Sequence, residues 1–214
     1  MGTLTKLTLG MMGRLRPKPA RGSADAFVSL PAPKKDGGMG LMEALSRRRS
    51  TREFAATEIS SDMLSDLLWS AFGVSSTDGH RTAPTALNAQ EIDVYLALPQ
   101  GAYRYDAARH GLELIASSDV RRVTGYQDFV DEAPLDLVFV ADYRRMTMVP
   151  VSQRESYASV AAGAIAQNVY LYAASVGLAT VLRGWIDREA IATALGLSHD
   201  EHVLLSQTVG FPKS

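Results

Sequence analysis

Four arginines stand within six positions of the sequence, in the run from Arg47 to Arg52. Such a dense group of like charges is repulsive unless an anion or solvent compensates it. Guanidinium groups bind phosphate through paired hydrogen bonds, and the hydroxyl of Ser50 adds a further donor. The run therefore indicates a phosphate-binding bend. The alternative is a solvated basic helix end, which the helix dipole also favours.

A second candidate site is the segment from residue 81 to residue 90, with the sequence RTAPTALNAQ. Its small residues would let a flat ring approach the backbone. The side-chain amides of Asn88 and Gln90 can pair with the carbonyl and N–H edge of a heterocycle. The alternative is a loop followed by a helical turn that Thr85 caps.

The third candidate is the segment Gly177–Gly184, where a helix is expected to end and a strand to follow. A strand that ends in Arg183 and Gly184 can direct a backbone N–H at a ligand, because glycine has no side chain to block it. The alternative is an ordinary connection between a helix and a strand.

The amino-acid composition excludes several kinds of active site. The chain has 214 residues, no cysteine and a net charge of −1. Without cysteine there is no disulfide scaffold, thiolate nucleophile or iron–sulfur cluster, so redox chemistry would require a bound cofactor. The near-zero charge gives no indication of nucleic-acid binding. No His–carboxylate or Ser–His arrangement is convincing, so we expect neither a catalytic side chain nor a metal site.

The first 36 residues differ in composition from the remainder. Seven basic residues and one acidic residue stand before Asp36, and several prolines oppose regular structure there. We expect a flexible basic extension over residues 1–36 and a single domain over residues 37–214. Export through a weak N-terminal signal is the minority alternative to a cytoplasmic location, because arginine and lysine precede the only site that resembles a cleavage site.

Hydrophobic patterning predicts a mixture of helices and strands. Ser156–Leu182 lacks any charge, but its polar centre and Gly177 indicate a core helix followed by a buried strand and no stable membrane insertion. Helices and strands do not alternate strictly, which favours an α+β fold. The expected helices are 39–49, 61–72, 117–123, 153–176 and 188–195, and the expected strands are 92–98, 103–105, 112–115, 135–140, 180–185 and 202–209.

Taken in order, these segments resemble the FMN-dependent nitroreductase family over about residues 39–212. The resemblance is carried by Arg48–Phe54, by Pro84–Gln90, by Ala166–Asn168 leading into Gly177–Thr180, and by the ending Val209–Pro212. It implies a mixed, mostly antiparallel central sheet flanked by helices. It also implies an intertwined homodimer, with the helix 153–176 in the dimer core and the flavin at the interface.

The resemblance also assigns roles to individual positions. Arg48, Arg49 and Ser50 match positions that hold the flavin phosphate, and Arg52 matches a cation beside the ribityl chain and the pyrimidine edge. Asn88 matches the amide that pairs with that edge, and Gln90 is a further cofactor-binding candidate. The positions that match segments against the flavin ring are Pro84, Thr85 and Ala86 from the partner subunit and Leu182, Arg183 and Gly184.

The implied activity is hydride transfer from NADH or NADPH through FMN to a nitroaromatic, a quinone or an enone by a ping-pong cycle. Two alternatives remain open. Relatives of the same fold dehydrogenate azoline rings or fragment flavin, and a non-catalytic module that binds an anion or flavin would also use the arginines. The chain ends at Lys213-Ser214, where many members continue to a basic residue that reaches the phosphate. Lys213 is the candidate substitute. Arg183 stands where many members carry an acidic or apolar residue, so it could bias the choice of nicotinamide or acceptor.

Overall fold

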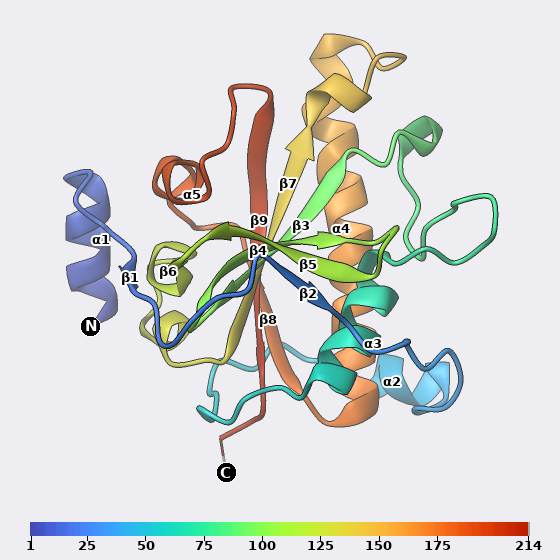
Figure 1. Cartoon of the computed structure of the whole chain (residues 1–214), viewed down its shortest axis with the longest axis horizontal. Helices are drawn as coiled ribbons and strands as arrows, with labels where there is room; N and C mark the ends of the chain where they lie inside the picture. The colour runs from blue at the N-terminus through green and yellow to red at the C-terminus, as the bar shows by residue number, and fades with distance from the viewer. Residues whose placement is uncertain (214) are drawn as a thin grey trace.

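A seven-stranded sheet forms the centre of the molecule, in the computed structural model that describes residues 1–213 (Figure 1). Its strand order is β2-β5-β4-β3-β7-β9-β8, and neighbouring strands are antiparallel. The strands are β2 (Phe27–Ser29), β3 (Ile92–Leu98), β4 (Gly101–Asp106), β5 (Gly111–Ala116), β7 (Leu135–Asp142), β8 (Ala179–Arg183) and β9 (Glu201–Gly210). A separate short sheet pairs β1 (Lys18–Pro19) with β6 (Ser118–Asp119).

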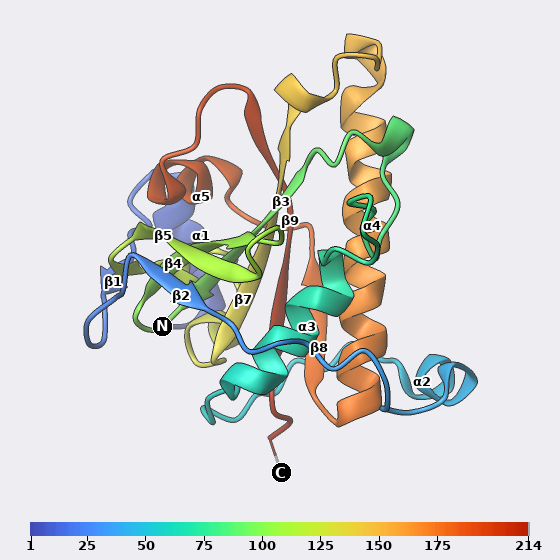
Figure 2. The same cartoon turned by 45° about the vertical axis from the view of Figure 1, so that its right-hand side comes forward.

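Helices cover both faces of the sheet (Figures 1 and 2). On one face lie α3 (Ser61–Phe72) and α4 (Val151–Val176), with α2 (Leu41–Arg47) beside the lower end of α4; on the other lie α1 (Thr3–Met11) and α5 (Arg188–Leu195). The 3-10 turns are η1 (Ala86–Asn88), η2 (Arg121–Val123), η3 (Asp128–Asp131) and η4 (Tyr143–Arg145). The predicted fold class, helices flanking a mostly antiparallel sheet, is confirmed.

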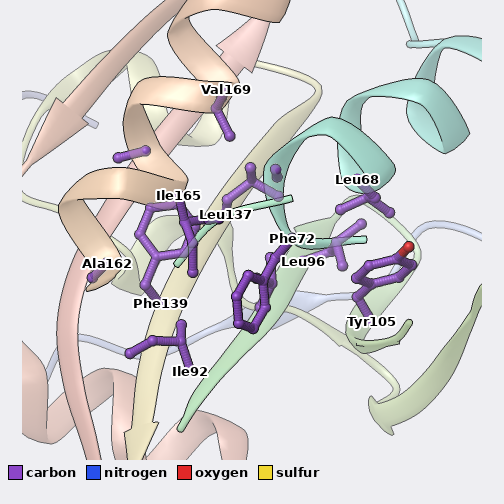
Figure 3. Close-up of a cluster of buried hydrophobic side chains, with 14 of the residues drawn as sticks. Leu68, Phe72, Ile92, Leu96, Tyr105, Leu137, Phe139, Ala162, Ile165 and Val169 are labelled. Carbon is purple, nitrogen blue, oxygen red and sulfur yellow. The ribbon is translucent and has the colours of Figure 1, made fainter. Parts of the chain in front are cut away.

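The central strand β7 is buried along its whole length because helices cover both of its faces. Leu137 and Phe139 point into the core beneath α3 and α4, whereas Val138 and Val140 point into the core beneath α5. Figure 3 shows Leu137 and Phe139 packed against Ile165 of α4. This alternation is the two-residue period of a strand between two apolar layers.

The predicted helix and strand ends are largely confirmed. Ser60 caps α3 because its Oγ accepts a hydrogen bond from the backbone N–H of Met63 at 3.3 Å. Asp187 caps α5 in the same way through Ala190 at 3.0 Å. Gly177 ends α4 in the left-handed conformation with φ 78°, which a residue with a side chain adopts only at a cost. Within residues 1–213, no helix combines the length and apolar content that crossing a bilayer requires.

The N-terminal residues, which we expected to form a flexible extension, make contacts with the rest of the molecule. Lys6 of α1 is fully buried, and its Nζ donates to the carbonyl of Gln127 at 2.8 Å and pairs with Asp131. Lys18 of β1 also pairs with Asp131, at 2.8 Å, and β2 forms the first strand of the main sheet. Two of the seven basic residues of this segment therefore share one acidic partner more than a hundred positions away, which composition alone does not reveal.

One short helix was predicted wrongly. The expected helix 117–123 is instead the strand β6 followed by the single turn η2. The carboxylate of Asp119 accepts hydrogen bonds from the guanidinium of Arg121 at 2.7 and 2.9 Å and from its backbone N–H at 3.1 Å. The pairing of β6 with β1 replaces the helical hydrogen bonds.

Candidate functional site

The arginine run lies where α2 ends and an extended segment begins, as predicted. Arg47 is the last helical residue and pairs with Glu43 at 2.5 Å. The guanidinium of Arg48 lies over the ring of Tyr170 on α4, with its central carbon 5.3 Å from the ring centroid. Within residues 1–213, neither Arg48, Arg49 nor Arg52 forms an ion pair with a carboxylate. We call residues 48–52 the arginine bend. The guanidinium groups of its three arginines are therefore available to bind an anion.

Two interactions join the arginine bend to the edge strand β8. The backbone N–H of Thr51 donates to the carbonyl of Thr180 at 3.0 Å. The side chain of Ser50 lies 2.7 Å from the phenol of Tyr170, and the same phenol accepts the N–H of Leu182 at 2.9 Å. The first and third sequence candidates therefore lie side by side in one protomer.

The edge position of β8 explains why Gly184 can present a free backbone N–H. On an edge strand, every second residue directs its N–H and C=O away from the sheet. On β8 these residues are Thr180 and Leu182, whose outward groups bind Thr51 and Tyr170. The same alternation assigns the next outward N–H to Gly184, which is exposed. Among the atoms of residues 1–213, a Cβ on Gly184 would meet only Leu205 Cδ2, at 3.6 Å, so folding of the single chain does not require glycine there.

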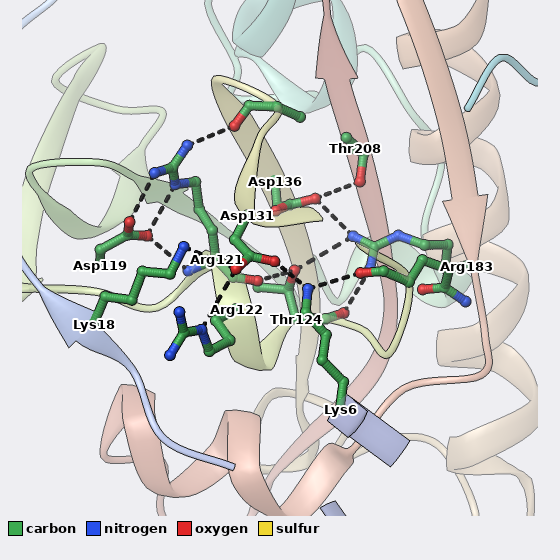
Figure 4. A network of polar contacts seen from close by, with 12 residues as sticks. Lys6, Lys18, Asp119, Arg121, Arg122, Thr124, Asp131, Asp136, Arg183 and Thr208 are labelled. Carbon is green, nitrogen blue, oxygen red and sulfur yellow. Dashed lines mark hydrogen bonds and ion pairs between the residues drawn. The ribbon is translucent and has the colours of Figure 1, made fainter. Parts of the chain in front are cut away.

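The side chain of Arg183, which we expected could influence the choice of nicotinamide or acceptor, points into the protein. Its side chain is only 5% exposed and pairs with Asp136 of β7 at 2.6 Å. Its guanidinium also donates to the carbonyl of Thr124 at 2.9 Å (Figure 4). Burial lowers the pKa of Arg183 and raises the pKa of Asp136. The side chain of Arg183 therefore belongs to the interior, and only its backbone remains a candidate for ligand contact.

The second candidate segment forms a strained loop around η1. Leu87, Asn88 and Gln90 have positive φ values of 54°, 52° and 49°. The side chain of Thr85 accepts the N–H of Gln90 at 2.9 Å. Strained conformations of this kind cost about 1–3 kcal/mol per residue and cluster at ligand-binding positions. The loop holds Asn88 and Pro84 exposed to solvent.

Gln90 is engaged within the loop. Its Oε1 accepts Arg81 Nε at 2.8 Å, and its Nε2 donates to the carbonyl of Gly79 at 3.0 Å. The predicted pairing of the Gln90 amide with a heterocycle would have to break these bonds. In the described part of the chain, the side chain of Asn88 instead has only a 3.3 Å contact from Gln90 Nε2 to its Oδ1. Of the two predicted amides, Asn88 is therefore the one available to a ligand.

The loop and the arginine bend approach different sides of α4. Asn168 donates to the carbonyl of Thr82, just before the loop, at 3.2 Å. Tyr170, which contacts Ser50, is two residues further along the helix, which is a rotation of about 200°. One protomer therefore does not bring all three candidate segments to one side of α4.

Lys213 lies beside the arginine bend through its backbone. Its N–H donates to the carbonyl of Glu53 at 3.2 Å, and Phe54 pairs with Pro212 in a β-bridge. Its exposed side chain lines a cavity of about 600 Å³ together with Arg21 and Pro134. The predicted contact of Lys213 with a phosphate stays a prediction.

Glu91 was missed by the sequence analysis and directly follows Gln90. Its side chain is fully buried, and neither carboxyl oxygen has a hydrogen-bond partner among residues 1–213. Burial raises the pKa of Glu91 above its ordinary value of 4.5. The folded state therefore retains the proton of this carboxyl group to a higher pH than the unfolded state does.

Replacing Glu91 with glutamine is expected to change the pH dependence of stability. A raised folded pKa means that the folded state binds more protons than the unfolded state, so the free energy of unfolding falls as the pH rises above about 4.5. Glu91→Gln removes this loss, so the variant should gain stability relative to the wild type between pH 5 and pH 8. Urea unfolding at both pH values measures the difference. Parallel pH profiles for the two proteins would show that Glu91 is not held protonated.

Tyr170 is a further residue that sequence reasoning missed. It lies within the uncharged run Ser156–Leu182, where its spacing is that of the buried face of α4. Its contacts with Arg48, Ser50 and Leu182 distinguish it from its apolar neighbours. Among the described residues, no group of three histidine, aspartate or glutamate side chains is arranged to hold a metal ion.

Comparison with known proteins gives consistent results. The model of the Nitroreductase family matches residues 45–211. The chain is 32% identical over 180 residues to a protein of Methanocaldococcus jannaschii described as a candidate nitroreductase, covering 79% of this chain and 90% of that protein.

Solved structures are similar over most of the chain. A crystal structure of a candidate nitroreductase from Ralstonia eutropha is 49% identical with a TM-score of 0.90, covering 94% of this chain and 96% of that chain. The NADPH:FMN oxidoreductase of Vibrio harveyi in complex with NAD+ is 22% identical with a TM-score of 0.60, covering 81% of this chain and 69% of that chain. The second likeness concerns the fold alone.

Proposed function

The chain belongs to the nitroreductase family of oxidoreductases, and we propose that it uses FMN to transfer hydride from NADH or NADPH to a small planar electrophile. A nitroaromatic, a quinone and an enone all belong to that substrate class. One observation carries the proposal. The arginine bend, whose guanidinium groups have no carboxylate partner within residues 1–213, lies beside the end of β8, where the backbone N–H of Gly184 is available.

The residues present fit a phosphorylated flavin. Arg48, Arg49 and Ser50 offer two cations and a hydroxyl on one short segment, which is a donor set suited to a phosphate group. Gly184 leaves open space that a Cβ would fill, although folding of the protomer does not demand it. The neighbouring N–H groups of β8 are already engaged, so the amide of Gly184 remains for a ligand.

Each residue has a defined task in this proposal. Arg48, Arg49 and Ser50 hold the phosphate group. Arg52 is exposed and lies two residues beyond Ser50, so its positive charge stabilises the negative charge of the reduced ring. Gly184 donates its N–H toward N5, and Asn88 pairs its amide with the pyrimidine edge. When bound, FMN supplies a ring that takes hydride from the nicotinamide and returns it to the acceptor on the same open face, in a ping-pong cycle.

A homodimer completes the site in this proposal. Because the Pro84–Asn88 loop and the arginine bend approach different sides of α4, the loop would cover the flavin bound to a second copy of the chain. Both α2 and α4 expose apolar side chains that such a contact would bury. On α2, Leu41 and Met42 are 63% and 78% exposed, and on α4 Val151 and Val160 are 77% and 72% exposed. Burial of these side chains between two copies would favour association. Light scattering of the purified protein should give twice the mass of 23.1 kDa.

The proposal is tested by anaerobic titration of the FMN-loaded protein with NADH and NADPH. We expect bleaching of the flavin absorbance by at least one of them and its recovery on addition of a quinone. Protein that binds FMN but is reduced by neither nucleotide would contradict the proposed hydride donor. Protein that does not take up FMN would contradict the proposed cofactor.

Replacing Gly184 with alanine tests the role of the β8 edge. The new methyl group would be tolerated in the free protomer but would occupy space proposed for the flavin ring. Overpacking of this kind costs about 1–3 kcal/mol, so FMN binding should weaken about tenfold or more. Flavin fluorescence measures the affinity, and the thermal midpoint of the flavin-free variant should match that of the wild type. Unchanged affinity would show that Gly184 does not contact the ring.

A further inference from the structure

Tyr170 connects the two segments that the proposed function assigns to the flavin. It extends from α4, and its side chain is 8% exposed. Its hydroxyl oxygen lies 2.9 Å from the backbone nitrogen of Leu182 and 2.7 Å from Ser50 Oγ. The arginine bend and the edge strand therefore share one buried phenol as a common hydrogen-bonding partner.

The direction of these hydrogen bonds follows from the chemistry of the groups. A backbone N–H can only donate, so the Tyr170 oxygen accepts from Leu182. Within residues 1–213, Ser50 Oγ is the one acceptor in contact with the phenol. We therefore assign the phenol proton to this bond, which leaves the Ser50 hydroxyl proton free to point outward. Consecutive hydrogen bonds polarise one another, so this chain strengthens the outermost donor.

We propose that Tyr170 is a positioning residue that directs the hydroxyl proton of Ser50 toward the phosphate group of the bound flavin. The inference rests on the proposed function, because it assumes that the anion at the arginine bend is the phosphate of FMN. The ring of Tyr170 has a second contact with the same bend, since the guanidinium of Arg48 lies over it at 5.3 Å. Tyr170 thus orients Ser50 through its hydroxyl and Arg48 through its ring.

Replacing Tyr170 with phenylalanine separates these two effects, because it removes the hydroxyl and keeps the ring. We expect FMN affinity to fall about tenfold, the usual effect of losing one hydrogen bond to a charged group. The affinity for riboflavin, which has no phosphate, should stay within about twofold. Tyr172→Phe is the matched control, because its hydroxyl donates to the carbonyl of Met63 at 3.3 Å and not to the arginine bend. It should leave both affinities unchanged.

A double-variant cycle tests whether Tyr170 acts through Ser50. Ser50→Ala should weaken FMN binding about tenfold in the wild type but less than about threefold in the Tyr170→Phe background. Additive losses would overturn the inference, as would a Tyr170→Phe protein that keeps the wild-type preference for FMN over riboflavin.

The flavin-free protein distinguishes failure of this inference from failure of the proposed function. Wild-type protein that binds neither flavin contradicts the proposed function and with it the phosphate as the target of Ser50. Hydrogen exchange of the Leu182 amide then decides whether the Tyr170 link exists. Exchange should be faster in Tyr170→Phe than in the wild type by about tenfold, and equal rates would overturn the link itself.

Discussion

The combined variant Arg48→Ala/Arg49→Ala is expected to lose at least about a hundredfold in FMN affinity. Hydrogen bonds to charged groups contribute about 1.5–3 kcal/mol each, so removal of two such donors costs about 3 kcal/mol or more. Folding should be little affected, because neither guanidinium has a carboxylate partner within residues 1–213. Flavin fluorescence and thermal unfolding measure the two quantities on the same protein.

Arg47→Ala is the matched control for this prediction. Arg47 belongs to the same run but pairs with Glu43 on α2. Its removal should leave FMN affinity within about twofold, because an exposed pair of this kind contributes little. Equal losses in the control and in the combined variant would show that the run acts only through its overall charge.

Asp136→Ala is expected to produce the largest loss of stability, about 3–5 kcal/mol. Asp136 is fully buried and is the ion-pair partner of Arg183, which is also buried. Its removal would leave the guanidinium with only uncharged partners, among them the carbonyl of Thr124 at 2.9 Å. Urea unfolding measures the change in the free energy of unfolding.

Two further variants separate the buried charge from the loss of a side chain. Asp136→Leu/Arg183→Met removes both charges and should regain much of the lost stability, because no unpaired charge is left inside. Arg144→Ala breaks the pair with Asp142, in which the side chain of Arg144 is 57% exposed, and should cost less than about 1 kcal/mol. An Asp136→Ala protein as stable as Arg144→Ala would contradict the account of a buried, compensating pair.

The fold was predictable where burial depends on local periodicity. The stripe of α3 and the two-sided apolar strand β7 are visible in the sequence, since each residue's environment follows from its position in a regular repeat. The arrangement of the N-terminal residues was not predictable in this way. The burial of Lys6 depends on Asp131, and nothing in the sequence near Lys6 indicates that partner.

The candidate site also has features that the sequence predicted and features that it did not. Residue types and spacing predicted the position of the arginine bend at the end of α2 and a strand leading into Gly184. The place of that strand at the sheet edge was not predicted. The inward direction of Arg183 could not, because it depends on Asp136 and Thr124 on other segments. The link through Tyr170 could not be predicted either, because its position on α4 is that of an ordinary core residue.

The central claim is that the arginine bend holds the phosphate of a flavin whose ring lies between Gly184 and the Asn88 loop of a second copy. A crystal structure of the FMN-loaded protein tests it most directly. We predict the phosphate against Arg48, Arg49 and Ser50, N5 within hydrogen-bonding distance of the Gly184 N–H, and the loop from the partner subunit across the ring. A flavin bound elsewhere, or a dimer in which these three segments lie apart with no flat cavity between them, would contradict the claim.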